Sequence, residues 1–498
     1  MILPLLLLGA ASLPFICVRW ARWLAIVQQK EYRLDRLFAF FDSTEGKREV
    51  ARVLPVAGDF SRTGMKRPHI TSRVVFVAVL SGLVLLVAAV LGSLFALGQQ
   101  SVIFSWLVVL AVLYVVVPLF VILACLPSTL ISWYITWKTL RQAQSKVQQG
   151  KPQIIGVGGS YGKTSTKHLV HHFLSQAYTV FVTPKSFNTK FSVAQSICSG
   201  YKNQEIALLE YGAYIRGEIE YLARWFRPSI AIETGFTPQH LSLFGTRENS
   251  ILAESELLAA LPKDGIAFCN GADAGAVEIC ERGVAQSGAR VVHYAGEDSV
   301  VQLHNVRLNP FGQLEATWKG HHLKTQLIGR QYQVNLQAAI AVAQHLKLSD
   351  QQIETAARTF QPSSSFIQGK ILQTGAYIID DGGTSNPKGF EAALTLLEEL
   401  PYTEKILLTT GMIDLGDESH QIHLELAERA QQMGVRVIHV GVDGKEEFAQ
   451  VFGDRLMTST TEAKSLLQSS HKEMLILLEG KVPKVLEDLI EELTERIV

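Results

Sequence analysis

The sequence predicts an α/β protein in which N-terminal membrane helices precede two α/β domains, and three observations support this prediction. Residues 74–97 and 102–126 contain no charged residue, and each run exceeds the roughly 20 residues that a helix needs to cross a bilayer. A strand, a glycine-rich turn and a helix follow at residues 153–177. Apolar, strand-like runs then alternate with helical patterns to the end of the 498-residue chain, which is typical of parallel sheets covered by helices.

The composition is that of a membrane protein with a soluble part. Charged residues make up 18% of the chain, below the usual level of about 25%. Lys and Arg together number 46, as do Asp and Glu, which excludes a typical nucleic-acid binder because such proteins are basic. The five cysteines have no C-x-x-C spacing, so neither a disulfide framework nor a cysteine zinc site is predicted.

Residues 1–150 form the predicted membrane region, with transmembrane helices at 2–18, 74–97 and 102–126. The first run lacks the basic start and cleavage site of a signal peptide. Twelve Lys and Arg residues lie between positions 19 and 73 and none in the turn at 98–101. The positive-inside rule therefore places the long loop and everything after about residue 140 in the cytosol, as in a multi-pass protein of the cytoplasmic membrane. The basic loop either fixes this topology and attracts anionic lipid, or binds a lipid-linked or nucleotide-linked anionic substrate.

Residues 156–168 read GVGGSYGKTSTKH and lie between the predicted strand 153–157 and the predicted helix 164–177. Glycines let the backbone fold around phosphate oxygens, and the start of the helix offers free N–H groups. Lys163 can neutralise phosphate charge, and the hydroxyl of Thr164 or Ser165 can bind Mg²⁺. The predicted nucleotide contacts are Gly159, Ser160, Gly162, Lys163, Thr164 and Ser165.

The stretch GSYGKTSTK resembles the G-[ST]-x-G-K-T-[ST]-T-K loop of the Mur ligases, which use ATP to build the peptide stem of peptidoglycan. Further stretches follow in the family's order and contain Asn188, Glu210, His240, Asn335, Asp381, Asn386 and Asp414. They most resemble the branch that adds D-alanyl-D-alanine. The resemblance implies a P-loop Mur ligase central domain at residues 151–349 and a Rossmann-like C-terminal domain at 350–498, with a joint near 361–365.

The resemblance also implies roles for these residues. Lys163, Glu210 and His240 would be catalytic, with Thr164, Glu210 and His240 as ligands of Mg²⁺, a role that Mn²⁺ would also suit. Asn335 and Asp381 would contact adenine and ribose, although a turn cap explains Asp381 equally well. Asn188, Asn386 and Asp414 would contact substrate, although Asp414 and His423 also fit domain-packing roles.

One position departs from the family at the second metal site. The family has a carbamylated lysine fourteen residues after the metal-binding histidine, and that position is Glu254 here. A glutamate carboxyl lies roughly 3–4 Å closer to the backbone, so a water, a backbone shift or Glu256 would have to bridge the gap. The alternative is that Glu254 is a surface helix residue.

A histidine cluster and three other departures leave further alternatives open. His168, His171 and His172 follow the loop and form either a metal site or a helix face toward solvent or another subunit. Gln331-Tyr332 and Gly383 stand where the family has His-Asn and Tyr, and the family's Arg near the start of the C-terminal domain is absent around residues 365–366. These departures are compatible with an inactive or substrate-shifted relative.

The resulting hypothesis is a membrane-tethered, ATP-dependent amide ligase that acts through an acyl phosphate. It would add D-Ala-D-Ala or a similar amine to a UDP-linked or lipid-linked peptidoglycan stem peptide, with membrane lipid and no nucleic acid as further partners. A ligase resembling poly-γ-glutamate synthases is one alternative, and an inactive membrane scaffold of cell-wall synthesis is another.

Overall fold

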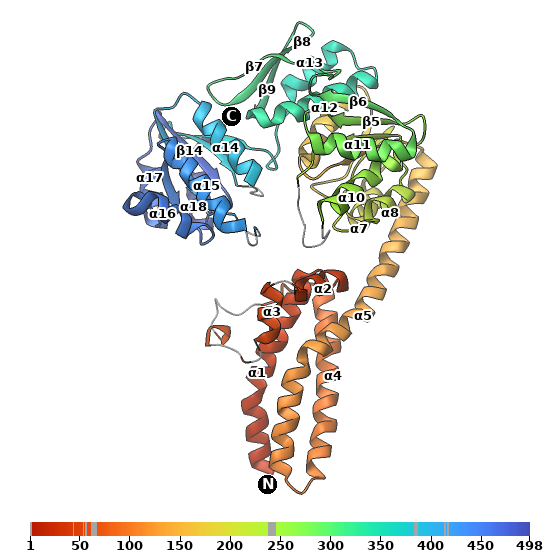
Figure 1. Ribbon diagram of the computed structural model, residues 1–498, viewed down its shortest axis with the longest axis vertical. Helices are drawn as coiled ribbons and strands as arrows, with labels where there is room; N and C mark the ends of the chain where they lie inside the picture. Colours follow the sequence, from red (N-terminus) through yellow and green to blue (C-terminus); the bar gives the residue numbers. More distant parts are fainter. Residues whose placement is uncertain are drawn as a thin grey trace. The chain divides into compact units, whose positions relative to one another are not determined.

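The computed structural model describes residues 2–42, 44–52, 54, 57–60, 67–237, 246–382, 387–412, 415 and 418–498. The described chain divides into two compact units, one ending at Gln142 and the other beginning at Ala143. The first unit consists of helices, and the second consists of sheets flanked by helices (Figure 1).

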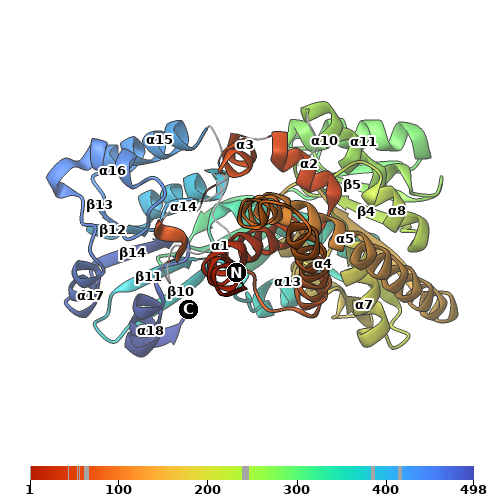
Figure 2. The ribbon, with the colours of Figure 1, turned by 90° about the horizontal axis from the view of Figure 1, so that it is seen from below.

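Three long helices lie side by side in the first unit (Figures 1 and 2). They are α1 (Ile2–Gln29), α4 (Ser72–Leu97) and α5 (Val102–Gly150), and the short helices α2 (Leu34–Asp42), α3 (Thr44–Ala51) and η1 (Ala57–Phe60) come between α1 and α4 in the chain. Trp23, Val77 and Val121 share an apolar core, whereas Leu86 and other large apolar side chains are exposed. Among the described residues, three segments are long and apolar enough to cross a membrane: Leu7–Gln29, Ser72–Leu97 and Val102–Gly150.

The first and third long helices extend beyond the segments predicted for them. The apolar run predicted at 2–18 continues as helix to Gln29, and the one predicted at 102–126 continues to Gly150. The last turns of α5 belong to the second unit, where Val147 is buried and Lys146 donates a hydrogen bond to the Cys198 carbonyl at 2.6 Å. This contact ties the end of α5 to α7 (Lys190–Gly200).

The second unit begins with a six-stranded parallel sheet in the order β2-β3-β1-β4-β5-β6. Its strands are β1 (Gln153–Gly158), β2 (Val180–Val182), β3 (Ile206–Glu210), β4 (Ile230–Glu233), β5 (Ile266–Asn270) and β6 (Arg290–Ala295). β3 and β4 are buried along their whole length, as expected for strands covered on both faces. β1 lies between them, so that Glu210 is level with Val157 and Glu233 with Gly158. Both carboxylates therefore emerge at the edge of the sheet where β1 enters the glycine-rich loop.

Helices cover both faces of this sheet. On one face, Leu169 and Phe173 of α6 (Lys163–Leu174) pack in a core that includes Val157. On the other face, Leu257 of α10 (Arg247–Ala259) lies so close to β1 that a Cβ atom at Gly156 would come within 2.9 Å of it. The remaining helices of this part are α8 (Glu218–Trp225), α11 (Ala274–Ser287), η2 (Arg330–Tyr332), α12 (Gln333–His345) and α13 (Asp350–Thr359).

An antiparallel sheet of three strands follows, which the sequence did not predict. It comprises β7 (His304–Leu308), β8 (Gln313–Trp318) and β9 (His321–Ile328). α13 packs against β9 and α6, so the helix that opens the predicted C-terminal domain belongs with the central sheet. The C-terminal sheet starts only after the predicted joint at 361–365.

The C-terminal sheet has the order β13-β12-β14-β11-β10-β15. Its strands are β10 (Gln368–Leu372), β11 (Tyr377–Asp381), β12 (Glu404–Thr409), β13 (Arg436–His439), β14 (Met474–Glu479) and β15 (Thr494–Ile497). The four predicted strands β11 to β14 are parallel, whereas β10 and β15 add an antiparallel edge. Figure 2 shows α14 (Pro387–Glu399), α15 (Ser419–Gln432) and α16 (Lys445–Phe452) on one face of the sheet, and α17 (Thr460–Gln468) and α18 (Lys484–Leu493) on the other. The short η4 (Gly453–Arg455) follows α16.

Candidate active site

The glycine-rich loop connects β1 to α6 and is held by the segment that follows β4. Gly159 and Gly162 have φ angles of +116° and +76°, a backbone region that residues other than glycine rarely adopt. The Ser160 N–H donates to the Gly235 carbonyl at 2.7 Å. The Thr234 hydroxyl lies 2.8 Å from the Gly158 carbonyl and 2.5 Å from the Tyr161 carbonyl. Thr234 and Gly235 therefore fix the loop, a role that the sequence motif did not reveal.

We expect Gly159→Ala to weaken binding of an ATP analogue by about tenfold or more. A Cβ atom at this position would come within 2.3 Å of the Thr234 hydroxyl oxygen, and backbone strain of this kind costs about 1–3 kcal/mol. Gly320→Ala is the matched control, because Gly320 also has a positive φ of +84° but has no neighbour within 4 Å of the added Cβ. Equal analogue affinities in calorimetric titrations of the two variants would contradict the role of Gly159.

Lys163 is the first residue of α6 and folds back over the loop. Its ammonium group donates to the Gly159 carbonyl and lies 3.4 Å from the Ser160 carbonyl. Burial raises the pKa of the Glu254 carboxyl and that of the Glu233 carboxyl, and the positive charge of Lys163 opposes this rise. The lysine thus lies over the loop and near two buried acids, where the loop motif predicts the phosphates.

The structure brings together Thr164, Asn188 and Glu210. Glu210 ends β3 and is 1% exposed. Its carboxylate accepts hydrogen bonds from the Thr164 hydroxyl at 3.1 Å and from the Asn188 side-chain amide at 3.2 Å. Three residues that are distant in sequence therefore meet at the start of α6, beside the predicted phosphate loop.

Lys167 is a site residue to which the sequence analysis gave no role. Its ammonium group is fully buried and lies 2.8 Å from the Glu210 carboxylate, and it also donates to the Lys185 carbonyl. Burial lowers the pKa of Lys167, and Glu210 opposes that shift. The available signal was the position of Lys167 one helical turn after Lys163, which places both lysines on one face of α6.

Glu254 is not a surface helix residue. It is 6% exposed, and its carboxylate accepts a hydrogen bond from the Gly159 N–H at 3.3 Å. Glu256, considered as a bridging alternative, is engaged elsewhere: it accepts from the Gly217 N–H at 2.7 Å and the Glu220 N–H at 3.0 Å. These contacts cap the start of α8, so Glu254 alone of the two acids reaches the loop.

Glu233 lies beside Glu254 and is a second residue that the sequence analysis missed. It is fully buried. Burial raises the pKa of Glu233, and the neighbouring Glu254 charge raises it further; burial also raises the pKa of Glu254. Two buried acids at the start of the loop thus carry a shared electrostatic cost that Lys163 only partly offsets.

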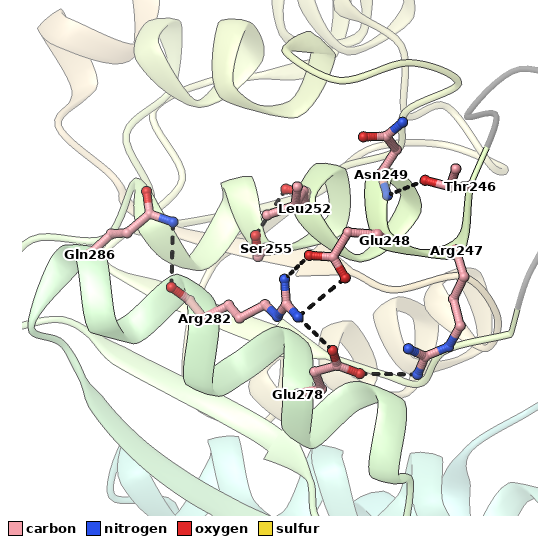
Figure 3. Close-up of polar contacts among 9 residues, drawn as sticks. All are labelled: Thr246, Arg247, Glu248, Asn249, Leu252, Ser255, Glu278, Arg282 and Gln286. Atoms are coloured by element: carbon pink, nitrogen blue, oxygen red, sulfur yellow. Dashed lines mark hydrogen bonds and ion pairs between the residues drawn. The ribbon is translucent and has the colours of Figure 1, made fainter.

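Polar contacts between α10 and α11 fix the helix that carries Glu254. Figure 3 shows the Arg282 guanidinium between Glu248 of α10 and Glu278 of α11. Arg247 adds a second contact to Glu278 at 3.0 Å, and the Thr246 hydroxyl caps α10 by accepting from the Asn249 N–H at 3.2 Å. A network of several charges stabilises geometry more reliably than an isolated surface pair.

The other residues that were predicted to contact the nucleotide lie in different parts of the structure. The Asn335 side-chain amide donates to the Thr166 hydroxyl at 2.8 Å and lies 3.4 Å from the Gly162 carbonyl, so it braces the start of α6. Ser165 lies in the first turn of α6. Asp381 ends β11 in the C-terminal sheet, where burial and then the neighbouring Asp380 raise its pKa to about 6. The remaining predicted residues, His240, Asn386 and Asp414, lie outside the described residues.

The three histidines of the cluster are half-buried, and two of them contact neighbouring parts of the protein, so the predicted helix face is only partly open to solvent. His168 makes an edge contact with Phe366, and the His172 ring nitrogen lies 3.1 Å from the Thr359 hydroxyl. Burial lowers the pKa of all three histidines. His423 is also fully buried and accepts from the Met412 N–H at 3.0 Å, in line with a packing role.

The donor atoms at the loop suit a hard divalent cation. The Thr164 hydroxyl and the Glu210 carboxylate supply oxygen ligands, which Mg²⁺ prefers, and Mg²⁺ commonly takes its other ligands from phosphate and water. In the part of the chain that the structure describes, no group of three or more His, Cys, Asp or Glu side chains could hold a metal. A cation at Thr164 and Glu210 would take its remaining ligands from nucleotide phosphate and water.

These features define a P-loop nucleotide-binding protein: a strand leads through a glycine-rich loop and a lysine into a helix, and an acidic strand end lies beside that helix. Residues 157–343 match the Mur ligase middle domain. The chain is 27% identical over 364 residues to UDP-N-acetylmuramoyl-tripeptide–D-alanyl-D-alanine ligase of Bacillus subtilis, covering 71% of this chain and 78% of the relative. The Escherichia coli enzyme of the same name is 24% identical, with 70% and 78% covered.

Solved structures show the same fold. MurF from Acinetobacter baumannii superposes with a TM-score of 0.63 at 22% identity, covering 72% of this chain and 80% of that one. MurF ligase from Thermotoga maritima, in complex with ADP, gives a TM-score of 0.61 at 23% identity, covering 72% and 84%. The chain thus contains a Mur ligase middle domain at residues 157–343 and is an ATP-dependent, amide-bond-forming ligase. The resemblance drawn from the sequence is thereby confirmed.

Proposed function

We propose that this ligase adds D-Ala-D-Ala, or a similar amine, to the stem peptide of a peptidoglycan precursor, and that it works at the cytosolic face of a membrane. The observation that carries the proposal is the meeting of Thr164, Asn188 and Glu210 beside the phosphate loop. It occurs in a chain whose relatives from B. subtilis and E. coli are named for this reaction.

The chemistry couples two displacements. A carboxylate of the stem peptide attacks the γ-phosphate of ATP, which releases ADP and forms an acyl phosphate; the amine then attacks the acyl carbon, and phosphate leaves as the amide forms. Both steps bring anions together, so their transition states need fixed positive charge and donors. Lys163 and the N–H groups of the loop supply these, while Thr164 and Glu210 would hold Mg²⁺, which neutralises phosphate charge when bound.

The second sheet supports a complete ligase over the poly-γ-glutamate-synthase-like alternative. The described C-terminal part contains six strands flanked by five helices, whereas the alternative implies an incomplete C-terminal domain. Asp381 stands at the carboxyl end of β11 in this sheet, the end of parallel strands at which ligands bind in open α/β sheets. We assign to this domain the delivery of the amine.

The ligase reaction is tested by phosphate release from the detergent-purified full chain with ATP, Mg²⁺, UDP-MurNAc-tripeptide and D-Ala-D-Ala. We expect release that requires both the acceptor and the amine. Release with a lipid-linked acceptor but not with the UDP-linked one would assign the acceptor to the membrane. ATP binding without release on any acceptor would contradict the ligase proposal and favour a scaffold.

Membrane attachment is a separate expectation. Three described segments are long and apolar enough to span a bilayer, and many of their large apolar side chains are exposed. We therefore expect the chain to stay in the membrane pellet during alkaline carbonate extraction and to dissolve only in detergent. Release into the carbonate supernatant would show that the helices do not span the membrane.

A further inference from the structure

A cluster of charged side chains lies against the long helices of the first unit. Arg22 of α1 pairs with Glu49 of α3 and lies 3.5 Å from Asp59 of η1. The Arg52 guanidinium lies 2.7 Å from the same Asp59 carboxylate. Arg22 and Asp59 are buried, at 8% and 6% exposure. Charged side chains are rarely buried to this extent, so the cluster requires a structural or functional explanation.

Contacts with α4 and α5 give the level of this cluster along the helices. Trp20 of α1 donates to the Ser81 hydroxyl of α4 at 2.9 Å, and the Arg19 guanidinium lies 4.7 Å from the centre of the Tyr114 ring of α5. At 1.5 Å per residue, Tyr114 is about 18 Å from the first residue of α5 and Ser81 is about 24 Å from the last residue of α4. The hydrocarbon layer is about 30 Å thick. With the turn between α4 and α5 at the outer surface, the cluster lies in the cytosolic half of this layer.

Exposed apolar side chains lie on both sides of this level. Val75 and Val79 are 48% and 57% exposed between the cluster and the cytosolic end of α4. On the other side, Phe15 of α1 makes an edge contact with Phe60 of η1 at 5.5 Å between ring centres, and both rings are exposed. Such surfaces suit lipid tails rather than water. Ionisable groups at membrane depth are costly and typically mark a functional site.

The pocket beside the cluster has an excess of positive charge. Among the described residues, its polar lining consists of three arginines, two acids and one tyrosine: Arg19, Arg22, Arg52, Glu49, Asp59 and Tyr114. The Nε atom of Arg52 is buried and has no hydrogen-bond partner in the part of the chain that the structure describes. The Arg52 side chain as a whole is 31% exposed, so an anion can approach it. The planar guanidinium group matches the geometry of phosphate, with which it forms paired hydrogen bonds.

We propose that this pocket binds the phosphate group of a membrane lipid from the cytosolic leaflet, with Arg52 as its main contact and the lipid tail beside Phe15 and Phe60. This inference rests on the membrane attachment in the proposed function. A lipid phosphate reaches this depth while its tail stays in hydrocarbon, whereas a free nucleotide would have to enter the hydrocarbon layer. An anionic phospholipid and an isoprenoid lipid phosphate share this chemistry.

The test measures lipid binding to the detergent-purified full chain by native mass spectrometry. The probes are phosphatidylglycerol and undecaprenyl phosphate, and diacylglycerol and undecaprenol are their phosphate-free counterparts. We expect one phosphate-bearing lipid per chain, and the tighter of the two identifies the source. Arg52→Gln should weaken its binding by about tenfold, the effect of losing a hydrogen bond between charged groups. Arg48→Gln is the matched control, because Arg48 is exposed on α3, and it should bind like the wild type.

A variant with the opposite expected effect separates binding from folding. Glu49→Gln releases Arg22 from its ion pair, so it should bind the phosphate-bearing lipid more tightly than the wild type. Thermal unfolding shows which variants are folded, and weaker or unchanged binding in folded Glu49→Gln would overturn the proposed site. Equal affinities of Arg52→Gln and Arg48→Gln, or of undecaprenol and undecaprenyl phosphate, would also overturn it.

Failure of this site and failure of the proposed function give different results. A wild type that binds the lipid phosphate but forms no amide overturns the ligase proposal and leaves the site standing. A chain that stays in the carbonate pellet and forms the amide, but binds phosphate-bearing and phosphate-free lipids equally, overturns only the site. Release of the chain into the carbonate supernatant overturns the membrane attachment and the site together.

Discussion

Replacing Lys167 with alanine is expected to destabilise the central domain by about 3–5 kcal/mol, because it leaves Glu210 buried without its cation. Both partners of this ion pair are almost completely shielded from solvent. The Thr164 and Asn188 hydrogen bonds to Glu210 remain, but they carry no positive charge. Hydrogen–deuterium exchange of peptides from β3 and α6 measures this local stability.

Two further variants make the result specific. Arg224→Ala removes an ion pair to Glu220 that is largely exposed, so its cost should stay below about 1 kcal/mol. The double variant Lys167→Met/Glu210→Leu replaces both charges by apolar groups and should recover much of the lost stability. If Lys167→Ala costs no more than Arg224→Ala, the buried pair does not stabilise this domain.

Lys163→Ala should lower ATP-dependent phosphate release by at least about 10²-fold, the loss typical of removing one group that stabilises developing charge. The lysine lies over the Gly159 and Ser160 carbonyls, where nucleotide phosphates would bind. Lys163→Arg should not rescue the rate, because the guanidinium fork differs in shape from the compact ammonium group. The assay is phosphate release at saturating substrates.

Lys202→Ala provides the control for this rate measurement, since Lys202 is exposed in the segment before β3. Its rate should match that of the wild type. If Lys163→Ala releases phosphate at a rate within about tenfold of the wild-type rate, another cation neutralises the phosphates. Lys167 could not replace it without breaking its contact to Glu210.

The sequence predicted those parts of the site that depend on local pattern. Strand, glycine-rich loop and helix are adjacent in the chain, so their order alone places Gly159, Lys163 and Thr164 around a phosphate. The acidic end of β3 was found through the family resemblance, because Glu210 follows the apolar run 206–209 where the family has its Mg²⁺-binding acid. Parallel strands then bring that carboxylate to the loop.

Tertiary pairing was harder to predict. Glu233 also follows an apolar run, at residues 230–232. That sequence pattern does not reveal that the Glu233 side chain is buried or that Glu254 approaches it from α10. The Lys167–Glu210 pair depends on the packing of α6 against β3. β10 and β15 were missed because both strands are short and only partly apolar, as their partly exposed residues show.

The central claim is that this chain forms an amide bond on a peptidoglycan stem peptide. Its most direct test is the mass of the acceptor after incubation of the full chain with ATP, Mg²⁺, stem-peptide acceptor and D-Ala-D-Ala. We expect an acceptor heavier by one D-Ala-D-Ala residue pair, with one ADP and one phosphate formed for each product. An unchanged acceptor mass with both UDP-linked and lipid-linked precursors, despite bound ATP, would contradict it.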